Sequence, residues 1–64
     1  MNVIINGTST TQTAQWLTFD EIARLVGIAH PTITVQPPGR EPVQMGAEES
    51  VTLVEGMSIT AVSS

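Results

Sequence analysis

The alternation of apolar and polar residues predicts strands near both ends of the chain and one helix between them. At the N-terminal side, the β-rich run 3–5 leads into Asn6-Gly7, the preferred residue pair for a two-residue type I′ turn. The segment that follows is rich in threonine, which suits a strand with one face in water. We therefore expect residues 2–6 and 10–16 to form a hairpin.

The stretch 17–28, LTFDEIARLVGI, carries the signals of a short amphipathic helix. Thr18 and Glu21 have the T-x-x-E spacing of a capping box, and Gly27 suits the left-handed residue that ends a helix. A helix this short needs tertiary packing on its apolar face. That predicted face consists of residues at helical spacing: Phe19, Ile22, Ala23, Leu25 and Val26.

Further alternation after the helix predicts the rest of a sheet. Residues 32–36 form one strand, Pro38-Gly39 suits a type II turn, and residues 43–45 follow Pro42 as a short edge strand. Residues 58–64, SITAVSS, read as a final strand. The predicted fold class is α+β: one domain over residues 1–64, with a four- to five-stranded mixed sheet and one helix across one face.

Charge and composition exclude several classes of function. The chain has two arginines and no lysine against six acidic residues, a net charge of −4, which disfavours binding to nucleic acids and to anionic membranes. It contains no cysteine, and no apolar run approaches the length of a membrane span. Because the N-terminal residues lack the pattern of a secretory signal, we expect a cytoplasmic protein.

Candidate catalytic and metal-binding groups are few. His30 is the single histidine and therefore the only candidate base for a serine or threonine nucleophile, in a predicted loop where a surface or helix-end role is simpler. Glu48 and Glu49 are either metal ligands or acid–base groups, or they belong to a solvated turn. Adjacent carboxylates in a polar loop favour the turn. We expect no enzymatic activity, no metal site and no cofactor.

Two residues are candidate contacts with a protein partner. Trp16, the only tryptophan, is either a core anchor or an exposed contact residue, because tryptophan is enriched at binding hot spots. Arg40 lies in the PPGRE loop and is either a contact or a solvated turn residue.

Three stretches of the sequence resemble bacterial multiubiquitin-type domains and related small ubiquitin-like proteins of the β-grasp fold. The stretches are VIING, LTFDEIARLVGI and EESVTLVEGMSITAV, and in the family an I-N-G hairpin, an L-T-x-x-E-I-x-x-L-x-G helix and a V-x-L-x-x-G-x-x-F/I stretch recur. The matching residues span nearly the whole chain: Ile5, Asn6, Gly7, Leu17, Thr18, Glu21, Ile22, Leu25, Gly27, Val51, Leu53, Gly56 and Ile59.

The resemblance implies a protein modifier or its precursor. It further implies activation at the C-terminal carboxylate by activating-enzyme-like and conjugating-enzyme-like proteins, processing by peptidase-like proteins, transfer to a target protein, and a role in antiphage defence. The attachment or processing residues would be Ala61, Val62, Ser63 and Ser64. Ubiquitin-type modifiers usually end in Gly-Gly, and this chain ends in Ala-Val-Ser-Ser. The alternatives are therefore a non-conjugated interaction or assembly module and, third, a phage-encoded mimic or structural protein.

Overall fold

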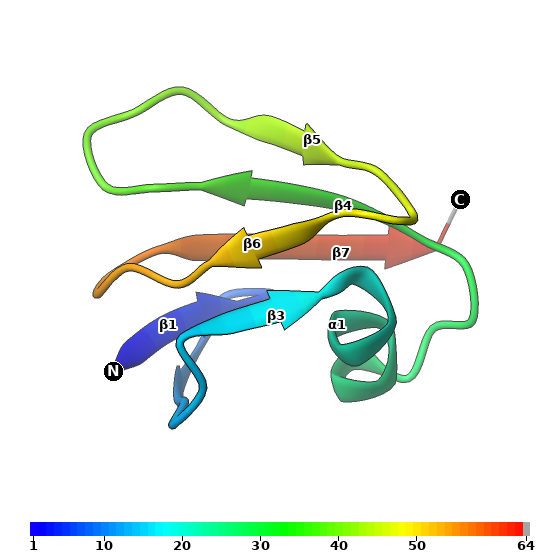
Figure 1. Ribbon diagram of the computed structural model, residues 1–64, viewed down its shortest axis with the longest axis horizontal. Coiled ribbons are helices and arrows are strands. Elements are labelled where there is room, and N and C mark those ends of the chain that lie inside the picture. The colour runs from blue at the N-terminus through cyan, green and yellow to red at the C-terminus, as the bar shows by residue number, and fades with distance from the viewer. Residues whose placement is uncertain (64) are drawn as a thin grey trace.

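A mixed five-stranded sheet forms one layer of the molecule in the computed structural model, which describes residues 1–63 (Figure 1). The strands of this sheet run in the order β2-β1-β7-β4-β5. A helix and a separate two-stranded sheet, β3-β6, lie over one face and form the second layer. The elements are β1 (Asn2–Ile5), β2 (Thr8–Thr11), β3 (Trp16–Thr18), α1 (Phe19–Val26), β4 (Pro31–Gln36), β5 (Val43–Met45), β6 (Ser50–Thr52) and β7 (Ser58–Ser63).

The centre of the sheet joins segments from the two ends of the described chain. β1 pairs in parallel with β7, with Ile5 opposite Ile59, while all other pairings are antiparallel. β7 also pairs with β4 along its full length, from Ser58 opposite Gln36 to Ser63 opposite Pro31. This α+β arrangement, with a hairpin, a helix and a central last strand, matches the predicted β-grasp fold.

The predicted turn and cap signals are present at the expected residues. Asn6 and Gly7 both have positive φ, 50° and 81°, and connect β1 to β2. The Glu21 amide donates to the Thr18 hydroxyl at 3.2 Å, while the Thr18 amide donates to the Glu21 carboxylate at 3.1 Å, which completes the capping box. Gly27 ends the helix in the left-handed conformation, with φ 72°.

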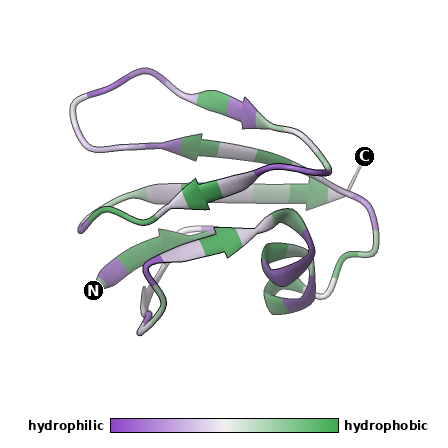
Figure 2. Cartoon of the chain, viewed as in Figure 1, coloured by the Kyte–Doolittle hydropathy of each residue, from purple (hydrophilic) through white to green (hydrophobic). Residues whose placement is uncertain are grey.

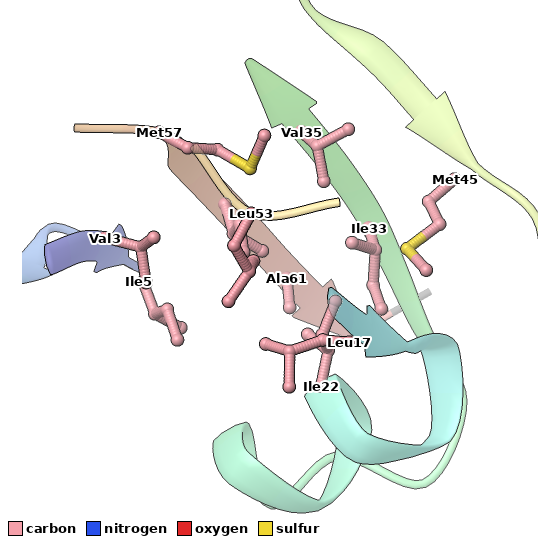
Figure 3. Close-up of a cluster of buried hydrophobic side chains, with 11 residues drawn as sticks. Val3, Ile5, Leu17, Ile22, Ile33, Val35, Met45, Leu53, Met57 and Ala61 are labelled. Atoms are coloured by element: carbon pink, nitrogen blue, oxygen red, sulfur yellow. The ribbon is translucent and has the colours of Figure 1, made fainter. Parts of the chain in front are cut away.

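The core between the layers is entirely apolar. Alternate residues of the large sheet point into it, and this alternation is visible along the strands in Figure 2. Within residues 1–63 no polar or charged residue is buried. The side chains that form the core, most of them drawn in Figure 3, are Val3, Ile5, Leu17, Ile22, Ala23, Ile33, Val35, Met45, Leu53, Met57, Ile59 and Ala61.

Two predictions from the sequence were wrong, one about the packing of the helix and one about the bounds of a strand. Leu25 was expected on the apolar helix face, but 53 % of it is exposed, because Ile22 and Ala23 take the positions that face the sheet. The second hairpin strand was expected over residues 10–16, but β2 ends at Thr11. Trp16 instead begins β3, which pairs with β6 through Leu17 opposite Val51.

Candidate protein-binding site

The face of the large sheet that points away from the helix is uncharged. We call it the outer face. Its residues follow from the strand register, since directly paired residues share a face. Every one of them is exposed or partly exposed. They are Asn2, Ile4, Ser9, Thr11, Thr32, Thr34, Gln36, Gln44, Ser58, Thr60 and Val62.

The distribution of charge makes this face distinctive. The two arginines and six acidic residues of the chain all lie elsewhere. Threonines dominate the middle of the face, where Thr34 of β4 lies directly opposite Thr60 of β7. Ile4 and Val62 add exposed apolar surface, with 38 % and 51 % of each residue accessible. A face with hydroxyls, methyl groups and no charge is suited to another protein surface, because the cores of protein interfaces are depleted of charged residues.

Three of the four predicted attachment residues, Ala61, Val62 and Ser63, lie in β7, the central strand of the large sheet. Ala61 is 1 % exposed and pairs with Ile33, so its side chain belongs to the core. Val62 and Ser63 are exposed but still form ladder pairs with Thr32 and Pro31. Ser64, the fourth of these residues, lies outside the described residues. Residues 61–63 are therefore paired within the sheet and do not form a tail that projects from the domain.

Asn6 holds this strand from the side. Its side-chain amide donates to the Ala61 carbonyl oxygen at 3.0 Å, and its side-chain oxygen accepts from the Ala61 amide at 2.7 Å. The Asn6 backbone amide also donates to the Ile59 carbonyl oxygen at 2.9 Å. Asn6 thus extends the β1–β7 ladder past the last backbone pair. Sequence reasoning assigned Asn6 only to the turn, and no local signal indicates a contact with a residue so distant in the chain.

The two predicted contact residues lie in different parts of the molecule. Trp16 is 55 % exposed, so it is not the core anchor that was one of its two predicted roles. It borders a surface hollow with Phe19 and Glu48, and Arg40 does not line that hollow. Arg40 is exposed in the turn after β4, where its amide donates to the Pro37 carbonyl oxygen and its carbonyl oxygen accepts from the Gln36 side chain.

No group of three or more histidine, cysteine, aspartate or glutamate residues is placed to hold a metal ion among residues 1–63. Glu49 accepts a hydrogen bond from the Gly46 amide, and the Glu49 amide donates to the Gly46 carbonyl oxygen, so this glutamate shapes its own turn. Over the same residues, the helix falls short of the length and apolar character needed to cross a bilayer.

Comparison with known proteins adds no relative. No family model matches the chain, and neither the curated proteins nor the solved structures give a match.

Proposed function

We propose that the chain is a protein-recognition domain that acts as a ubiquitin-like modifier or modifier precursor in the cytoplasm of a bacterial cell. The observation that carries the proposal is the outer face, an uncharged surface over the whole of a β-grasp sheet. The Glu55 carboxylate accepts from the Asn2 amide at 3.0 Å at one end of the face, but the residues of the face itself carry no charge that a partner would have to desolvate, which keeps the free-energy cost of binding low. Fold alone does not define function, so the surface is the stronger argument.

In the modifier proposal, the outer face is the surface recognised by activating and conjugating enzymes, and β7 leads to the carboxylate that they act on. Val62 lies on the outer face and Ser63 is the next residue, so recognition and attachment would take place side by side. Processing would occur after Ser63 and not at Ala61, since removal of Ala61 would open the core and break its hydrogen bonds to Asn6, so the Ser63 carboxylate would be the point of attachment. Conjugation would serve antiphage defence.

A second candidate function is a non-conjugated interaction or assembly module. The observation that favours it is the ladder pairing of residues 61–63, since a chain segment must be extended and free to enter the active site of an activating enzyme or peptidase. In this proposal, the outer face binds its partner without covalent chemistry.

The experiment compares four forms of the N-terminally tagged chain expressed in its source cells. They are the unchanged chain, a deletion of residues 63–64, Thr60→Lys, and the matched control Thr13→Lys. Thr60 is exposed near the middle of the outer face, and Thr13 is exposed in the loop between β2 and β3. The readouts are denaturing immunoblots for heavier covalent species and mass spectrometry of partners that co-purify under native conditions.

The modifier proposal predicts covalent species that persist in Thr13→Lys, weaken in Thr60→Lys and disappear in the deletion. The module proposal predicts no covalent species and a co-purifying partner that only Thr60→Lys loses. If the four forms give the same pattern, the outer face has no role in recognition and both proposals are wrong.

A further inference from the structure

A second surface differs from the outer face in its chemistry. It is the hollow of about 370 Å³ beside Trp16, which we call the Trp16 hollow. Both aromatic residues of the chain, Trp16 and Phe19, line it, together with the carboxylate residues Asp20, Glu48 and Glu49. Neither arginine lines it. Half of the six acidic residues are therefore gathered around the only tryptophan, which is 55 % exposed.

The fold brings these residues together from two distant segments. Trp16 belongs to β3, whose partner β6 follows the acidic turn at residues 47–49. The Phe19 amide at the start of the helix donates to the Glu49 carbonyl oxygen at 3.2 Å, which fixes that turn beside the first helical residues. The Trp16 hollow is thus built on backbone pairing and not on mobile side chains.

The carboxylates of the hollow differ in their availability. Glu49 is occupied by the Gly46 amide. Asp20 and Glu48 are exposed, and within residues 1–63 neither carboxylate accepts a hydrogen bond. Two unengaged carboxylates that line the same hollow as an exposed tryptophan are complementary to a flat cation. Indole is the best side-chain partner for such a group, and the guanidinium group of arginine both stacks on aromatic rings and forms paired hydrogen bonds with carboxylates.

We propose that the Trp16 hollow binds an arginine side chain of a partner protein, with the guanidinium group against Trp16 and paired with Asp20 and Glu48. Arginine fits better than lysine because the ammonium group is a compact, strongly hydrated charge without a stacking face. The inference rests on the proposed function of protein recognition and names the chemistry of one partner contact. It places this contact on the helix side of the molecule, so that a partner of the outer face leaves it open.

The first measurement is a titration of the full chain with the peptide acetyl-Gly-Arg-Gly-amide at low ionic strength. Trp16 fluorescence reports directly on the site because the chain has no other tryptophan. The matched control peptide carries citrulline, which has the shape of arginine without its charge. We expect a saturable change with the arginine peptide and none with the citrulline peptide, and amide chemical-shift changes confined to residues 16–20 and 47–50.

Three charge-neutralising variants test the assignment of the carboxylates. Asp20→Asn and Glu48→Gln should each weaken binding of the arginine peptide by about two- to fivefold, the range of an exposed ion pair. Glu41→Gln removes one negative charge from the loop between β4 and β5, away from the hollow, and should leave binding unchanged. Circular dichroism confirms that each variant is folded.

Equal weakening by all three variants, or equal binding of the citrulline peptide, would overturn the inference and indicate general attraction to an acidic protein. Absence of binding to the arginine peptide would overturn it as well. In either case the Thr60→Lys experiment still decides the proposed function, because it tests the other face of the molecule.

Discussion

The contact between Asn6 and Ala61 allows a quantitative prediction. Each of its two side-chain hydrogen bonds contributes about 0.5–1.5 kcal/mol net, so together they should stabilise the fold by about 1–3 kcal/mol. Asn6→Gly removes both bonds. Glycine also relieves the backbone strain of the left-handed conformation at φ 50°, which raises the stability of the folded state. At the same time it increases the conformational entropy of the unfolded chain, which lowers that stability. These two backbone effects have similar size and opposite sign, so the measured loss reports on the amide.

The assay is urea unfolding at neutral pH, followed by circular dichroism. Asn6→Gly should lower the free energy of unfolding by about 1–3 kcal/mol without a change in the slope against urea, since the surface exposed on unfolding stays the same. Asn6→Ala should lose about 1 kcal/mol more, because alanine lacks the short polar side chain that lets asparagine adopt the left-handed region at low cost. Gln15→Ala, which removes an exposed amide, is the control and should change stability by less than about 0.5 kcal/mol. A loss below about 0.5 kcal/mol in Asn6→Gly would show that the amide does not hold β7.

Three further predictions concern the helix and the hairpin turn. Ile22→Ala, at a fully buried position, should lower the free energy of unfolding by about 2–5 kcal/mol in thermal or urea unfolding. Leu25→Ala, at an exposed position, should lower it by less than about 1 kcal/mol. Equal losses in the two variants would contradict the packing of the helix. Thr18→Ala should cost about 0.5–2 kcal/mol by loss of the capping box, with the decrease read from the urea midpoint, and an unchanged midpoint would argue against the cap. Gly7→Val, at φ 81°, should lower the melting temperature clearly, and a melt like that of the unchanged chain would rule out the left-handed turn.

Local signals predicted the helix and the first turn well, for a physical reason. Thr18, Glu21 and Gly27 act through hydrogen bonds and backbone conformations that span only a few residues, so the sequence around them is sufficient. The same holds for Asn6-Gly7, whose positive φ values are a property of the two-residue turn. The β-grasp fold was predicted from the order of these elements together with the family resemblance, and the sheet arrangement bears it out.

The missed features depend on pairings between distant segments. β3 and β6 are three residues each, and their single buried side chain, Leu17, gives too little periodicity to reveal them. The exposure of Trp16 follows from that pairing, since Leu17 takes the inward position. The outer face could be foreseen only in part. Its threonine content is evident from the sequence, but the order of the strands that makes it continuous is not.

The parallel pairing of β1 with β7 has a consequence for how the protein folds during synthesis. β1 is made first, yet its neighbour in the centre of the sheet is the last strand, so the two must close a loop that contains almost the whole domain. Until β7 has left the ribosome, β1 and β4 have no strand between them, and the core lacks the side chains of Ile59 and Ala61. We therefore expect the hairpin and helix to form early, and the domain to become protease-resistant only after release of β7 from the exit tunnel.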